Sequence, residues 1–113
     1  MIYWLVRAKW DMVDKINDFL HNNEWINGYE SDNYCNEVNS IQKGDLLILV
    51  DGSYTIYYGK CSENLKDGIT VKIDQWIEIN PIFIAEKGAY RKSISKISNA
   101  KLKKKLMKLF LKH

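Results

Sequence analysis

The chain has 113 residues, of which 46% are hydrophobic and 27% are charged, and its formal net charge is +3. These values are typical of one globular domain and exclude an intrinsically disordered chain or a coiled-coil filament. Because the sequence has no apolar run of about 18 residues, no signal-peptide pattern and only two cysteines, we expect a reduced, cytoplasmic chain that contacts no membrane and has neither a disulfide framework nor a zinc site.

The first predicted elements are a strand and a helix. Ile2–Arg7 is a run of aromatic and β-branched residues, which is typical of a strand whose alternate side chains face opposite sides of a sheet. Apolar residues then recur at helical spacing over residues 12–20, with Asp11 as the N-cap. Asn22–Asn23 ends this predicted helix.

Short strands joined by turns are predicted in the middle of the chain. Residues 27–37 are polar and predict a loop. Gly59 lies inside a predicted strand, where it indicates a bulge or a close backbone approach. The strands are predicted over Leu46–Val50, Tyr54–Cys61, 69–73 and 76–79, with turn signals at Lys43-Gly44-Asp45, Asp51-Gly52-Ser53 and Lys66-Asp67-Gly68, and a further apolar run over 82–85.

Five or six short strands joined by tight hairpins, with one helix after the first strand and one at the end, predict an α+β fold. We expect a small, bent, mainly antiparallel β-barrel flanked by helices. This barrel domain is predicted to span residues 1–90. A basic helical segment over residues 91–113 then packs on the barrel or leads into a linker.

Charge is divided unevenly between these two parts. Residues 1–90 contain 8 Lys or Arg against 14 Asp or Glu, whereas residues 91–113 contain 9 Lys or Arg and no acidic residue. In the second part Leu102, Leu106, Leu109 and Phe110 form an apolar stripe among lysines, which is typical of a basic amphipathic helix. Such a helix can contact phosphates, an anionic membrane or a partner protein, or it can pack its stripe on the domain and leave its lysines solvated.

The sequence contains no pattern of catalytic residues. His21 and His113 lie at a predicted helix end and at the terminus, and neither has a nucleophile at a suitable spacing. Asp11, Asp14 and Asp18 share a helix face, where solvation explains them better than a metal does. Phosphate-binding and zinc-protease motifs are absent from the sequence. We therefore expect no enzymatic activity, no metal and no cofactor.

Aromatic residues near predicted turns are the stronger functional signal. The sequence has four Trp and seven Tyr, and Trp10, Trp25, Tyr29 and Tyr54 fall near predicted loops. Aromatic faces at the end of a barrel can stack a planar base, including one flipped out of a duplex. The alternative is that large aromatics fill the core, which is the interpretation we favour for Trp4 and Trp76 inside strands.

Several motifs resemble one known family. Tyr3-Trp4-Leu5-Val6-Arg7-Ala8, Trp10, Asp14, Phe19-Leu20 and Trp25-Ile26-Asn27-Gly28-Tyr29 resemble the N-terminal EVE-like domain of McrB-like restriction ATPases, which belongs to the PUA-like group. Ile41-Gln42-Lys43-Gly44-Asp45, Tyr58-Gly59-Lys60-Cys61, Asp67-Gly68, Val71-Lys72-Ile73 and Trp76 resemble the group's motifs in the middle of the domain. The resemblance runs from about residue 2 to residue 85, and the loop over 51–54 is shorter than in many relatives.

The resemblance implies a small β-barrel that recognises a modified base in DNA by flipping it into an aromatic pocket, as the specificity part of a McrBC-type, modification-dependent restriction system. It implies a AAA+ motor in the same chain and a nuclease subunit as partners. The alternatives are an RNA-binding PUA-like domain and a protein-interaction domain. The residues carried over are Trp10, Trp25, Tyr29 and Tyr54 for the pocket, Arg7 and Asp51 for the base edge, and Lys9, Arg91 and Lys92 for phosphate contacts.

Overall fold

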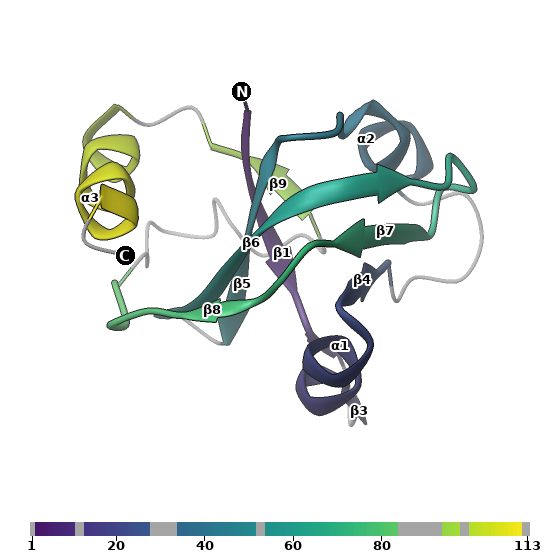
Figure 1. The fold of residues 1–113 in the computed structure, drawn as a ribbon, viewed down its shortest axis with the longest axis horizontal. Coiled ribbons are helices and arrows are strands. Elements are labelled where there is room, and N and C mark those ends of the chain that lie inside the picture. The colour runs from purple at the N-terminus through teal and green to yellow at the C-terminus, as the bar shows by residue number, and fades with distance from the viewer. Residues whose placement is uncertain are drawn as a thin grey trace.

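The computed structural model describes residues 2–10, 13–27, 34–51, 54–83, 94–97 and 100–111, which contain nine strands and three helices (Figure 1). The strands are β1 (Tyr3–Arg7), β2 (Lys9–Trp10), β3 (Val13–Asp14), β4 (Glu24–Ile26), β5 (Leu46–Asp51), β6 (Tyr54–Asn64), β7 (Thr70–Ile73), β8 (Ile77–Glu78) and β9 (Ile94–Lys96). The helices are α1 (Ile16–Asn22), α2 (Cys35–Ser40) and α3 (Ala100–Leu111). None of these helices is long and apolar enough to cross a membrane.

Seven of the strands form one mixed sheet, in the order β4-β7-β6-β5-β1-β9, with β8 paired to β6. Strands β1 and β5 are parallel, the other neighbours are antiparallel, and β2 pairs with β3 in a separate hairpin. The predicted α+β class is confirmed, but the expected antiparallel barrel of five or six strands is wrong. Within the described residues, β4 and β9 are edges of an open sheet. A parallel pair needs a long crossover, here through α1, β4 and α2, and local turn signals do not reveal it.

The sheet has a hydrophobic core on each face. Strand β5 is buried on both sides: Leu47 and Leu49 join the core that contains α1 and α2, whereas Ile48 joins the core that contains Leu102 and Leu106 of α3. Figure 1 shows α3 standing apart from the other two helices. Burial of a leucine side chain stabilises a fold by roughly 1.5–3 kcal/mol. The apolar stripe of α3 therefore packs on the sheet through these two leucines.

Helix α1 begins four residues later than predicted. Val13 and Asp14 pair with β2 instead of continuing the helix, and the Asp14 carboxylate accepts the N–H of Ile16 at 3.0 Å. The predicted C-terminal end is confirmed, because Asn23 adopts a left-handed conformation (φ 50°) and its N–H donates to Phe19 O. The predicted cap, Asp11, lies outside the described residues.

Helix α2 replaces part of the predicted polar loop. It has six residues and buries only Val38, so the sequence shows no apolar stripe that would have indicated a helix. Gly59 behaves as predicted, because a Cβ there would lie 2.9 Å from Gln75 O and 3.3 Å from the Trp76 ring. This close approach lets the segment that joins β7 to β8 lie against β6.

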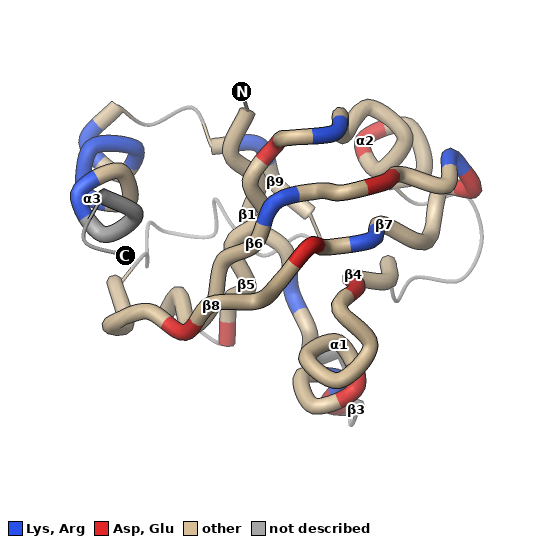
Figure 2. The backbone as a smooth tube through the Cα atoms, viewed as in Figure 1, with Lys and Arg blue, Asp and Glu red and all other residues tan. Residues whose placement is uncertain are grey.

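Charged residues are segregated in the structure as they are in the sequence. Figure 2 shows the lysines of α3 together on one side of the molecule, whereas Asp and Glu are spread over the other elements. On α3 the side chains of Lys101, Lys104, Lys105 and Lys108 are exposed. The positive charge therefore faces solvent on a helix that turns Leu102 and Leu106 toward the core.

Candidate nucleic-acid interface

The sheet brings three of the predicted site residues to one edge. Arg7 is the last residue of β1 and pairs with Val50, so it lies beside the end of β5. Asp51 is the last residue of β5 and pairs with Tyr54, the first residue of β6. Because β1 and β5 are parallel, their carboxyl ends meet at the same edge, and the β5–β6 hairpin places Tyr54 there too. Arg7, Asp51 and Tyr54 thus lie on three adjacent strands.

Trp25 lies beneath this edge. It is fully buried, at 0% exposure, in the core that also contains Phe19 and Trp76. Its indole N–H donates to the backbone carbonyl of Arg7 at 3.0 Å. In this structure the Trp25 ring is therefore covered by other side chains, and it contacts the interface through the backbone of Arg7.

Trp4 and Trp76 are both buried, as expected for tryptophans within or beside strands. The indole N–H of Trp76 donates to Phe19 O at 3.1 Å, and lies 3.3 Å from Glu24 O. These bonds join the end of α1 and the start of β4 to the segment before β8. Both tryptophans thus have structural hydrogen-bond partners, which buried indole groups need.

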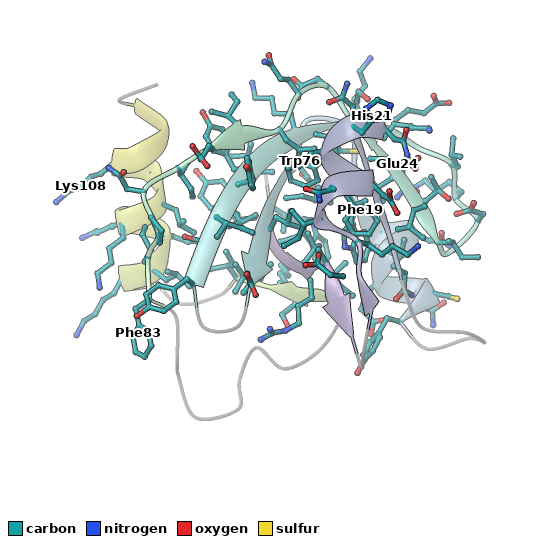
Figure 3. All side chains as sticks on the ribbon, turned by 90° about the horizontal axis from the view of Figure 1, so that it is seen from below. Phe19, His21, Glu24, Trp76, Phe83 and Lys108 are labelled. Carbon is teal, nitrogen blue, oxygen red and sulfur yellow. The ribbon has the colours of Figure 1, made fainter. Side chains whose placement is uncertain are left out.

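An exposed aromatic pair continues the interface beyond Tyr54. The rings of Tyr54 and Phe83 lie 5.4 Å apart, centroid to centroid, with a tilt of 58°, and their exposures are 49% and 59%. A bridge joins the two backbones, and buried Thr55 exchanges hydrogen bonds with Ile82: its N–H donates to Ile82 O at 3.0 Å, and its Oγ1 accepts the Ile82 N–H at 3.1 Å. Figure 3 shows Phe83 pointing away from the body of the protein.

Phe83 was not among the predicted site residues. It lies in the apolar run over 82–85, and its side chain is exposed. The sequence signal for this position was the nearby proline: Phe83 lies two residues after Pro81, the only proline in the sequence. Neighbouring exposed apolar side chains that form one patch, unlike a single exposed residue, can mark a binding site.

Of the other predicted site residues, two follow β1 in the sequence and three lie outside the described residues. Lys9 and Trp10 form β2, which follows β1 after Ala8 and pairs with β3. Tyr29, Arg91 and Lys92 lie outside the described residues. The structure therefore groups Arg7, Asp51 and Tyr54, places Trp25 beneath them and adds Phe83.

A small pocket lies between α1 and β4. It has a volume of about 160 Å³ and is lined by Lys15, Asp18, Phe19, Asn22, Glu24 and Ile26. Its charged groups pair locally: Lys15 lies 3.5 Å from Asp18, and Lys72 lies 2.9 Å from Glu24. Two carboxylates at the rim disfavour a phosphate ligand. Across the described segments, no group of three His, Cys, Asp or Glu side chains is placed to hold a metal ion.

Comparison with known proteins identifies the fold. No family model matches the sequence, and no curated protein sequence matches it. The solved structures that match include the YTH domain of the Zygosaccharomyces rouxii MRB1 protein in complex with N6-methyladenosine RNA, at 13% identity and a TM-score of 0.59, covering 95% of this chain and 84% of that chain.

Two bacterial structures match to a similar degree. Rpa0253 from Rhodopseudomonas palustris is 16% identical with a TM-score of 0.58, covering 96% of this chain and 92% of that chain. Atu2648 from Agrobacterium tumefaciens is 15% identical with a TM-score of 0.57, covering 92% and 90%. Over nearly its whole length, this chain is therefore similar in fold to a YTH domain.

Proposed function

We propose that this chain is a non-catalytic module that binds nucleic acid carrying a modified base. The observation that supports it most is the meeting of Arg7, Asp51 and Tyr54 at one edge of the sheet, next to an exposed aromatic pair. The similarity in fold to a YTH domain solved with N6-methyladenosine RNA supports the same function.

The proposed roles follow from the chemistry of the side chains. The face of Tyr54 stacks on a base, which contributes roughly 1–3 kcal/mol and offsets a few kcal/mol of unstacking. The guanidinium of Arg7 donates hydrogen bonds to the base edge and the carboxylate of Asp51 accepts them. Trp10 and Tyr29 are proposed to complete the pocket, Trp25, which is fully buried, to support it from beneath, and Lys9, Arg91 and Lys92 to contact phosphates.

The proposed ligand is either DNA or RNA. The sequence resemblance favours DNA, with the chain as the specificity part of a McrBC-type restriction system, joined to a AAA+ motor and acting with a nuclease subunit. In that proposal residues 1–90 form the recognition domain and residues 91–113 a basic segment. RNA is the second candidate, favoured by the RNA in the YTH complex. A protein that distinguishes the two must contact the 2′-hydroxyl.

The test is binding measured by fluorescence anisotropy. The oligonucleotides are matched DNA and RNA strands that carry N6-methyladenine, 5-methylcytosine, 5-hydroxymethylcytosine or no modification. We expect one modified strand to bind at least 10-fold more tightly than its unmodified counterpart, and Tyr54→Ala to abolish this preference.

Ile69→Ala is the matched control, because Ile69 is an exposed apolar residue at the β6–β7 hairpin and should leave the preference unchanged. Equal affinity for all modified and unmodified strands, in both polymers, would contradict the proposal. A partner protein captured by the same surface, with no binding to nucleic acid, would favour the protein-interaction alternative.

A further inference from the structure

The exposed face of α3 is a second charged surface that the base site does not use. Lys101, Lys104, Lys105 and Lys108 recur at i, i+3, i+4 and i+7, so they lie along one face of the helix. Within the part of the chain that the structure describes, the ammonium groups of Lys104, Lys105 and Lys108 have no hydrogen-bonded or ion-paired partner. Figure 3 shows Lys108 pointing away from the rest of the molecule.

This arrangement works against the stability of the helix itself. Lysines at i, i+4 spacing repel one another, and the positive N-terminal end of a helix disfavours lysine in its first turn. No acidic residue is present in the first turn of α3, and none occurs anywhere in 91–113. Of these four lysines, only Lys108, in the last turn, is favoured by the helix dipole. A bound polyanion would remove the repulsion.

The fold buries two leucines of α3 and leaves its lysines exposed. Leu102 and Leu106 are buried in the core with Leu5 and Ile48, so the helix is held against the sheet by its apolar stripe. A helix that lies on a membrane would instead insert that stripe into the lipid. Because Leu102 and Leu106 are already buried in the core, charge complementarity favours a polyanion that binds the exposed lysines.

The exposed aromatic pair lies on the same side of the molecule as α3. Ile82 packs against the same core cluster as Leu102 and Leu106, so the segment that carries Phe83 and α3 both cover this core. Figures 1 and 3 agree, because in both views the segment that ends at Phe83 lies at the α3 side of the molecule. Tyr54, which bridges to Phe83, belongs at the same time to the proposed base site.

We infer that the Tyr54–Phe83 pair and the lysine face of α3 form a track for single-stranded nucleic acid that leads away from the base site. Proteins that hold single strands combine a positively charged surface with aromatic rings on which bases stack. Residues 101–108 span about 10 Å of helix, which corresponds to about three phosphates of a stacked strand. This inference rests on the proposed function, because the track binds the continuation of the nucleic-acid strand whose modified base the site holds.

The experiment measures the affinity of matched modified and unmodified single strands of 6 and 15 nucleotides between 50 and 300 mM salt. The variant is Lys104→Gln/Lys108→Gln. Its control is Lys43→Gln/Lys60→Gln, which removes the same charge from exposed lysines on the turn before β5 and on β6. Circular dichroism confirms that both variants are folded.

We expect the α3 variant to bind the 15-nucleotide strands roughly 20-fold more weakly at 0.1 M salt, with a salt slope shallower by about 1.4, because each lost phosphate contact on a single strand contributes about 0.7 to the slope. The ratio between modified and unmodified affinities should not change, since these lysines contact no base. Phe83→Ala should weaken the 15-nucleotide strands about 5-fold or more and leave the 6-nucleotide strands nearly unchanged.

Three results would overturn the inference. The first is an equal loss in the α3 variant and its control, which would indicate net charge alone. The second is an unchanged salt slope in the α3 variant. The third is binding to vesicles that contain phosphatidylserine through Lys104 and Lys108, with oligonucleotide binding unaffected. If only the proposed function is wrong, the protein will show no preference for modified strands, but the salt slope will still depend on the lysines of α3.

Discussion

The indole N–H of Trp4 donates a hydrogen bond to the carboxylate of Asp45 at 3.1 Å, joining two buried residues 41 positions apart. The same carboxylate accepts the backbone N–H groups of Ile2, at 3.1 Å, and Gln42, at 3.0 Å. These bonds hold the first residues of β1 beside the first residues of β5. They thereby support the parallel register that brings Arg7 and Asp51 together at the other end of the pair.

Replacing Asp45 should therefore destabilise the fold strongly. Asp45→Ala leaves one buried and two partly buried N–H groups without this acceptor, and each unsatisfied buried group costs about 1–3 kcal/mol. We expect a loss of at least 3 kcal/mol in the free energy of unfolding, measured by urea denaturation. Asp45→Asn keeps one acceptor oxygen and should lose less. A loss below 0.5 kcal/mol in Asp45→Ala would mean that this carboxylate does not hold the strands together.

Trp25 should contribute to stability through its indole N–H. Trp25→Phe retains a large buried ring but leaves the carbonyl of Arg7 without this donor, so we expect a loss of about 1–3 kcal/mol. Tyr54→Phe, which changes an exposed aromatic residue, should cost less than 0.5 kcal/mol and serves as the control. Thermal unfolding of both variants measures the difference. Equal stability of the two would show that the Trp25–Arg7 bond is not needed in the core.

The two cysteines should differ in reactivity. Burial, and next the negative charge of Asp45, raise the pKa of the Cys61 thiol above its ordinary value. Because the thiolate is the reactive form, Cys61 should resist iodoacetamide at pH 8 in the folded protein and react only after unfolding. Half-buried Cys35 should be alkylated first. Mass spectrometry of partly alkylated protein identifies the order, and labelling of Cys61 before Cys35 would contradict it.

Asp67 should make stability depend on pH. Desolvation opposes ionisation of its carboxyl group, but hydrogen bonds from the backbone N–H groups of Thr70 and Ile69 outweigh it and lower the pKa below its ordinary value of 3.8. A lowered pKa in the folded state stabilises the protein above pH 3.8, and this stabilisation disappears as the pH falls through the lowered value.

The comparison variant is Asp67→Asn, which keeps an acceptor oxygen but removes the charge. We expect the unfolding free energy of Asp67→Asn to fall below that of the parent at pH 7. The difference should close at acidic pH, below the lowered pKa of Asp67. Urea denaturation at pH 7, 4 and 3 measures it. A difference that is the same at all three pH values would show that the charge of Asp67 has no part in it.

Local patterns in the sequence determined most of the elements. The strand at Tyr3–Arg7, the apolar strand at Leu46–Asp51 and the terminal helix at Ala100–Leu111 follow from side-chain periodicity and turn residues, which act over a few positions. The sequence also predicted the division of charge between residues 1–90 and the basic segment over 91–113. It predicted the close approach at Gly59 as well, because only glycine has no Cβ to obstruct a neighbouring segment.

Only the tertiary structure decided which of these elements are neighbours. The parallel pairing of β1 with β5 joins residues more than 40 positions apart, and it leaves the sheet open instead of closing it into a barrel. In the structure Trp25 is buried, whereas Tyr54 is exposed beside Phe83, although Trp25 and Tyr54 are both aromatic residues near predicted loops. Periodicity tells which side chains share a face of a strand. Whether that face is covered depends on strands and helices that come from distant parts of the chain.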